Sequence, residues 1–158
     1  MVVKFRILLL LTAIVLTASG CAGSKQDINV LQDGSYTAQM EEYSYGWKEY
    51  VTVVVKNGEI VSTEFNAENA SGFIKSWDNA YMQNMNPVSG TYPNEYTRYY
   101  AAQLTGRKKA PGIDLLSGAT NSGNNFQKLS EAVVKQALKG DSTVVLVSSP
   151  GQHGTSPE

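Results

Sequence analysis

The dipeptide Asn57-Gly58 is the strongest local constraint on how this chain can fold. It stands between two runs that are rich in β-forming residues, at 47–56 and 59–65. Asn-Gly readily adopts the positive φ angles of a type I′ turn, whose twist matches that of two antiparallel strands. The sequence therefore predicts an antiparallel hairpin, and the run 35–40 predicts a third strand beside it.

Three later segments show helical spacing of their apolar residues. They cover residues 76–86, about 94–105 and 122–139. Pro93 suits the first turn of the second helix, and Gly140 suits the stop of the third. Residues 141–147 are expected either to add an edge strand or to begin the tail.

The first of these helices is expected to be capped by Ser76. Trp77, Tyr81, Met82 and Met85 are near helical spacing on it. Such a tyrosine and methionine face is more often part of a core than of a cofactor site. The order of strands followed by helices predicts an α+β fold, with an antiparallel sheet and helices packed on one face.

The N-terminus has the pattern of a lipoprotein signal peptide at residues 1–20. Lys4 and Arg6 precede an apolar core at 7–16, and small residues follow it. Cys21 comes directly after them, so the segment resembles a bacterial lipobox. Cleavage before Cys21 would leave a lipidated cysteine, whereas an ordinary secretory cut would leave a free thiol.

The remaining boundaries follow from composition. Residues 21–32 are interpreted as a lipid-anchored tether, residues 33–147 as the folded domain and residues 148–158 as a disordered tail rich in Ser, Pro and Gly. The expected location is the extracytoplasmic face of the cell membrane.

Charge and composition exclude several classes of function. The net charge is −1, and no stripe of Lys or Arg suggests a nucleic-acid partner. Cys21 is the single cysteine and His153 the single histidine. A Cys/His metal site, a Cys–His pair and a Ser-His-Asp triad are therefore not expected.

Residues 114–122 form a small, polar stretch that leads directly into the third helix. The first N–H groups of a helix lack partners within it, and the helix dipole favours negative charge there. Ser117, Thr120 and Ser122 could add hydroxyl donors, and Gly118 and Ala119 would let a phosphate approach the backbone. The alternative is an ordinary Ser/Thr cap after a turn.

The order Asp114-x-x-Ser117-Gly118-Ala119-Thr120 resembles the flavinylation signature of FMN-binding domains. These domains occur in periplasmic subunits of sodium-pumping and related membrane oxidoreductases, and in extracellular flavoprotein lipoproteins. The resemblance runs from about residue 33 to about residue 140. Its further stretches are residues 33–36, 47–51, 57–60, 71–72, 75–76 and 124–126, with Tyr81 and Met85.

This resemblance implies an electron carrier rather than an enzyme that converts a substrate. A flavin transferase would esterify the phosphate of FMN to Thr120, and Ser117, Gly118, Ala119 and Ser122 would surround that phosphate. Asp114 would belong to the stretch that the transferase recognises, or would help to position the loop that precedes the third helix. The implied electron donor is a membrane oxidoreductase. Some relatives hold FMN without a covalent bond, and Thr120 would then be one donor among several.

Residues 41–47 combine acidic and aromatic side chains between the first two predicted strands. Tyr43, Tyr45 and Trp47 could lean back on the sheet as part of a surface turn, or could stack on a flat ring such as a flavin. The alternative for the whole chain is a lipid-anchored surface binding module or antigen without a redox cofactor.

Overall fold

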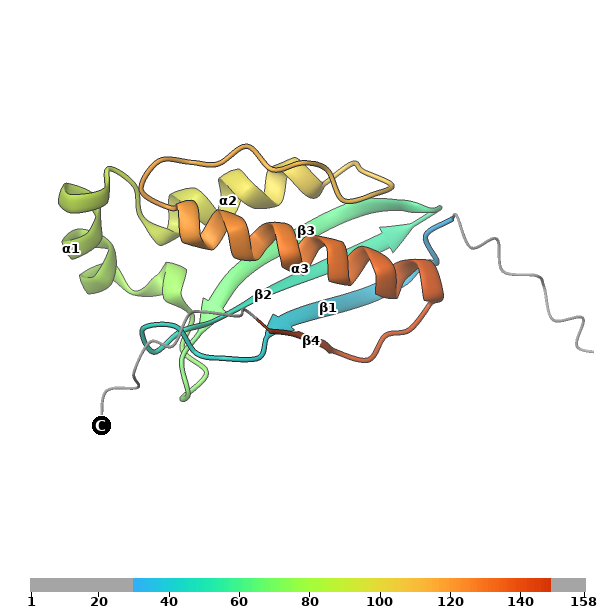
Figure 1. Ribbon diagram of the computed structural model, residues 1–158, viewed down its shortest axis with the longest axis horizontal. Helices are drawn as coiled ribbons and strands as arrows, with labels where there is room; N and C mark the ends of the chain where they lie inside the picture. Colours follow the sequence, from blue (N-terminus) through green and yellow to red (C-terminus); the bar gives the residue numbers. More distant parts are fainter. Residues whose placement is uncertain (1–29, 149–158) are drawn as a thin grey trace, which may run out of the picture.

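The computed structural model describes residues 30–148, which form a mixed sheet with helices along one side (Figure 1). The strands are β1 (Gly34–Met40), β2 (Lys48–Lys56), β3 (Glu59–Glu68) and β4 (Val145–Val147). The helices are η1 (Lys75–Trp77, a 3-10 turn), α1 (Asn79–Ser89), α2 (Pro93–Leu104) and α3 (Thr120–Lys139). The predicted α+β class is confirmed.

The sheet is built on the predicted hairpin. Strand order is β3-β2-β1-β4, and β1, β2 and β3 are antiparallel neighbours. Asn57 and Gly58 have φ angles of 54° and 72° between the paired residues Lys56 and Glu59, as a type I′ turn requires. The edge strand is present as β4, but it runs parallel to β1, so the sheet is antiparallel only in its larger part.

One face of the sheet carries the core. Side chains alternate along β2, where Val51, Val53 and Val55 are buried. Helix α3 packs on β1 and β2, while α2 packs on β3 (Figure 1). Three aromatic rings, Phe65, Tyr100 and Phe126, meet at the centre of this layer.

Two of the three helices begin and end near the predicted positions, and α1 differs in detail. Asp78, not Ser76, caps α1, and its carboxylate accepts a hydrogen bond from the Tyr81 N–H at 2.9 Å. Ser76 is buried and bonded to Asn66 instead. None of the α1 residues is fully buried. Met85 is partly buried against the core, and Tyr81 and Met85 also line a cavity, so the Tyr/Met face belongs to the core only in part.

The folded domain begins slightly before the predicted boundary. Leu31, assigned to the tether from sequence, is buried in the core, and the Gln32 N–H donates to the Ala137 carbonyl. The predicted signal peptide, Cys21 and tail residues 149–158 lie outside the described residues. Within residues 30–148, no helix combines the length and the apolar character needed to cross a bilayer.

Candidate functional site

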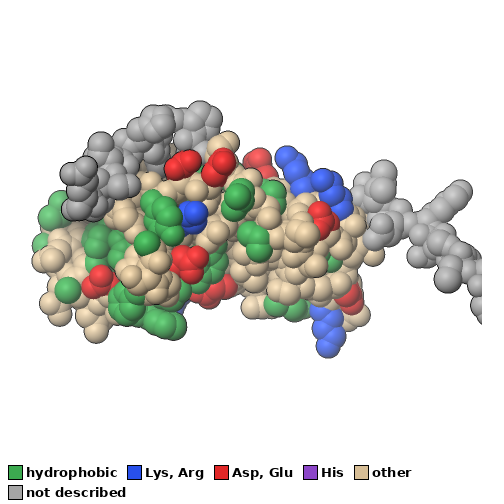
Figure 2. All heavy atoms as spheres, turned by 90° about the horizontal axis from the view of Figure 1, so that it is seen from below, with side chains coloured by type: hydrophobic (Ala, Val, Ile, Leu, Met, Phe, Trp, Pro, Cys, Tyr) green, Lys and Arg blue, Asp and Glu red, His purple; other side chains and the backbone are tan. Residues whose placement is uncertain are grey.

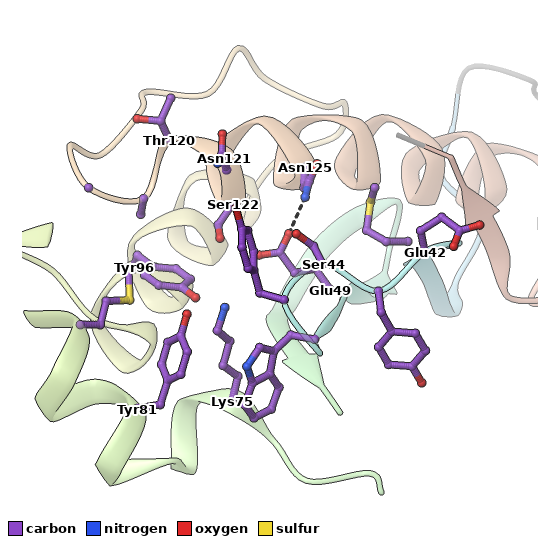
Figure 3. Close-up of a pocket in the computed structure, with 17 residues that line it drawn as sticks. Glu42, Ser44, Glu49, Lys75, Tyr81, Tyr96, Thr120, Asn121, Ser122 and Asn125 are labelled. Atoms are coloured by element: carbon purple, nitrogen blue, oxygen red, sulfur yellow. Dashed lines mark hydrogen bonds between the residues drawn. The ribbon is translucent and has the colours of Figure 1, made fainter. Parts of the chain in front are cut away.

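A cavity of about 360 Å³ opens at the end of the molecule where α3 begins. Its walls come from the first turns of α3, the 41–47 loop, the start of β2, η1, α1 and α2 (Figure 3). The volume lies near the lower end of the usual range for small-molecule sites, roughly 300–1,000 Å³. Segments far apart in the sequence therefore converge on one hollow.

The first turn of α3 forms one rim of this cavity. Its N-cap is Ala119, which provides no side-chain cap. The ordinary Ser/Thr cap considered from sequence is therefore not what the structure contains. The free N–H groups of the first turn lie beside the cavity, and the helix dipole makes this position favourable for an anion.

Tyr100 holds the turn that precedes α3. Its hydroxyl donates to the Ala119 carbonyl and accepts from the Leu116 N–H, both at 3.0 Å. The ring is buried in the aromatic core. Tyr100 lies in the segment 94–105 that was predicted as a helix, but this polar role was not predicted. A buried tyrosine in need of a hydrogen-bond partner was the available signal.

Packing against α1 requires a glycine at position 118, in addition to the expected approach of a phosphate to the backbone there. Its φ angle is 80°, a conformation that residues with a Cβ rarely adopt. A Cβ at this position would also collide with the carbonyl oxygen of Ser89, at the end of α1. The glycine thus lets the signature stretch lie directly against α1.

The structure separates the predicted site residues into two groups. Gly118, Ala119, Thr120 and Ser122 line the cavity. Asp114 and Ser117 are exposed and are not part of its lining. Gln103 holds the backbone of Asp114 through two hydrogen bonds, so that this part of the signature is fixed on the outside.

Thr120 and Ser122 take different places at the rim. Thr120 is exposed, and Figure 3 shows it at the edge of the group, away from Lys75. Ser122 points toward Tyr96 (Figure 3). An exposed hydroxyl at the mouth of the cavity is accessible to a modifying enzyme.

Two oppositely charged side chains that sequence analysis did not single out lie in the cavity wall. Lys75 is 9% exposed and Glu49 is 8% exposed. Glu49 follows the inward alternation of Val51 and Val53 on β2, so an acid at a core-facing position was the signal for it. Its Oε2 accepts a hydrogen bond of 2.7 Å from Asn125 Nδ2.

The aromatic 41–47 loop forms another part of the cavity wall. Tyr43, Tyr45 and Trp47 all line the cavity. Trp47 is buried and makes an edge contact with Tyr81, with ring centroids 6.0 Å apart, whereas Tyr45 is 81% exposed. Trp47 therefore packs inward, while Tyr45 is exposed at the cavity; stacking of these rings on a flat ligand stays a prediction.

Tyr96 closes the floor beside Ser122. Burial is the largest cause that raises the pKa of its phenol above the ordinary 10.0, and the charge of Glu49 adds to it, while the Ser122 hydroxyl acts in the opposite direction. The phenol therefore stays protonated at neutral pH and can donate a hydrogen bond.

These features fit a phosphorylated ligand with a flat, polar ring. The α3 N-terminus offers free N–H groups, the loop offers aromatic faces, and Lys75 has an ammonium group directed into the space between them (Figure 3). Among residues 30–148 there is no cluster of three acidic, His or Cys side chains that could hold a metal ion.

Comparison with known proteins finds similarity to a small bacterial lipoprotein. The chain is 28% identical over 117 residues to the "15 kDa lipoprotein" of Treponema pallidum (strain Nichols). The aligned region covers 73% of this chain and 83% of that protein. No family model matches, so the resemblance to FMN-binding domains depends on the motif and its flanks alone.

A solved structure shows the same fold. The crystal structure of the CPE2226 protein from Clostridium perfringens superposes with a TM-score of 0.71 and is 33% identical in sequence. The match covers 75% of this chain and 98% of that one. The folded domain is therefore shared almost completely.

Proposed function

The chain belongs to the same family as the CPE2226 protein of Clostridium perfringens, and we propose that this chain uses the shared fold to carry FMN outside the cytoplasm. The proposal is that of a lipid-anchored electron carrier, with the phosphate of FMN esterified to Thr120. When bound, the flavin supplies the redox chemistry, and the protein supplies attachment, orientation and electrostatics.

One observation supports this function above the others. The cavity joins the first turn of α3, which suits a phosphate, to the aromatic 41–47 loop, which suits a flat ring. The two halves of an FMN molecule thus have complementary surfaces within one site. The motif that suggested flavin attachment from sequence supplies Gly118, Ala119 and Thr120 to that site.

The two signature residues outside the cavity are assigned another role. Asp114 is exposed while its backbone is fixed by Gln103, a geometry that presents the carboxylate to a second protein. In this proposal the flavin transferase recognises Asp114 and Ser117 from outside while it modifies Thr120.

The proposed location is the outer face of the cell membrane. Cys21 follows a lipobox-like segment, and the Treponema pallidum relative is itself named a lipoprotein. A covalent cofactor suits this location, because a flavin lost outside the cytoplasm is not replaced. A membrane oxidoreductase is the proposed electron donor.

The test is an intact-mass measurement on the mature protein made together with a flavin transferase. Thr120→Ala should remove covalent flavin without unfolding the domain, because Thr120 is exposed and provides no cap. Thr120→Ser keeps a hydroxyl and should retain at least part of the modification. The added mass should equal FMN less one water and should map to the Thr120 peptide.

The outcomes separate three possibilities. Flavin that survives denaturation in Thr120→Ala would show that another residue carries it. A yellow protein of unmodified mass would mean that FMN is held without a bond. A colourless wild-type protein, which contains no flavin, would contradict the proposed electron-carrier function.

A second candidate is a surface binding module without a cofactor. Hydrophobic side chains gather at the α1 end of the molecule (Figure 2), where Trp77 is 68% exposed and Val88 87% exposed. Exposed aromatic and aliphatic groups of this kind are found at interaction surfaces. A colourless protein would favour this candidate.

A further inference from the structure

Lys75 is an unusual feature of the cavity because it is buried without a polar partner. Within residues 30–148, no hydrogen bond or ion pair is formed by its ammonium group. Nζ lies 4.8 Å from the ring centroid of Tyr81 and 5.8 Å from that of Trp47. A buried ammonium normally pairs with an anion or an acceptor, so this one is available to a ligand.

Local structure forces the side chain into this position. Lys75 begins the 3-10 turn η1, and the neighbouring Ser76 is buried and anchored to Asn66. The anchor fixes the turn against β3, and Lys75 then points into the cavity, toward its centre in Figure 3. The long apolar stem packs against the wall while the charge faces the space.

Glu49 also lies in the cavity wall, but its carboxylate forms no ion pair with Lys75. Its carboxylate is held by Asn125 at 2.7 Å, which fixes it from the α3 side. The cavity therefore contains a positive and a negative group that are kept apart. A ligand that carries both acceptors and a donor on one edge, as the pyrimidine ring of a flavin does, is complementary to such a wall.

Position decides which part of FMN would meet Lys75. Thr120 lies at the rim on the α3 side, while Lys75 lies with Tyr81 and Trp47 on the other side of the cavity (Figure 3). A phosphate esterified to Thr120 would be at the rim. The ring would then extend toward Lys75.

Resting on the proposed function, we propose that Lys75 raises the redox potential of the flavin by facing its ring. Two electrons and one proton taken from a donor leave the reduced ring with one negative charge. A cation in a partly water-excluded cavity stabilises that charge and has no equivalent effect on the neutral oxidised ring. Glu49 acts in the opposite direction.

A purely structural role for Lys75 makes a different prediction. The ammonium could serve only to join the 41–47 loop to α1 through its two ring contacts. Removing the charge would then lower stability and leave the potential unchanged. The two roles are separated by measuring the potential and the unfolding transition on the same variants.

The experiment is spectroelectrochemical titration of the flavin in the covalently loaded protein. Lys75→Met should shift the oxidised-to-reduced equilibrium toward the oxidised form by at least about tenfold, which is about 30 mV lower for a two-electron couple. Lys75→Arg keeps the charge and should stay near the wild-type value. Lys48→Met is the matched control, because Lys48 contacts Tyr43 at this end of the molecule but does not line the cavity.

A second set of variants covers a failure of Lys75→Met to fold. Lys75→Gln removes the same charge with a polar side chain, and Glu49→Gln removes the opposing charge and should raise the potential. An equal potential in wild type, Lys75→Gln and Lys75→Met overturns the role of Lys75, even though the flavin is present. A wild-type protein that takes up no flavin overturns the proposed function instead, and the two failures are thereby distinguished.

Discussion

At the scale of single residues, Gly118 shows why a motif can be found from sequence and still be explained only in part. The sequence indicated a small residue beside a possible phosphate. The structure adds the positive φ angle and the contact with Ser89, which joins residues far apart in the chain. Lys75, Glu49 and Asn125 stand in stretches that carry the family resemblance, but their place at one site was not predicted, because only the folded chain brings them to one cavity.

This packing leads to a test on Gly118. We expect Gly118→Ala to lower the free energy of unfolding by roughly 1–3 kcal/mol, since a side chain in the left-handed region is strained and the carbonyl of Ser89 must move as well. Urea denaturation measures the loss. Gly112→Ala is the control, because no atom lies within 4 Å of a Cβ there, and it should change stability by less than about 0.5 kcal/mol.

A Gly118→Ala variant as stable as the wild type would mean that the end of α1 does not press on the signature stretch in solution. Equal losses in both variants would point to the general effect of replacing glycine in a loop rather than to this contact.

At the scale of elements, the hairpin, α2 and α3 were predictable because their signals are local. Asn57-Gly58, Pro93 and Gly140 each act on their own segment. The parallel pairing of β4 with β1 depends on a return of the whole chain, and no local pattern specifies it. Helix α1 was located correctly, but its Tyr/Met face was assigned to the core because periodicity cannot tell a core from a cavity.

Helix α1 should open more easily than the rest of the domain. It has no fully buried residue, and its start depends on the Asp78 cap. Asp78→Ala should destabilise α1 by about 1 kcal/mol, and amide exchange in α1 should rise severalfold while exchange in α3 stays unchanged. Asn84→Ala, at an exposed position in the same helix, is the matched control.

Faster exchange across α3 as well would show that α1 and the core unfold as one unit. No change in α1 would mean that the cap is not limiting and that Tyr81 and Met85 hold the helix from the cavity side.

At the scale of the whole molecule, the folded domain and its proposed anchor are separate parts. Cys21→Ala should release the protein from membranes into the soluble fraction, because none of the helices in residues 30–148 can span a bilayer. Fractionation of cells followed by immunoblotting measures this. The domain from residue 30 onward should show the same unfolding transition in both proteins. Continued attachment of the variant would indicate a second membrane contact.

The chain enters the domain at one end of α3, and the cavity lies at the other end. Gln32 bonds to Ala137 in the last turn of α3, whereas the cavity lies at the first turn, and a helix of 20 residues is about 30 Å long. The described chain thus enters the domain at the end of α3 far from the cavity (Figure 1). In the proposed lipid-anchored carrier, the cavity would be directed away from the membrane, so that a soluble acceptor would reach it directly. A donor in the bilayer would reach it only after the domain reorients, and the proposed anchor would therefore favour transfer to soluble acceptors.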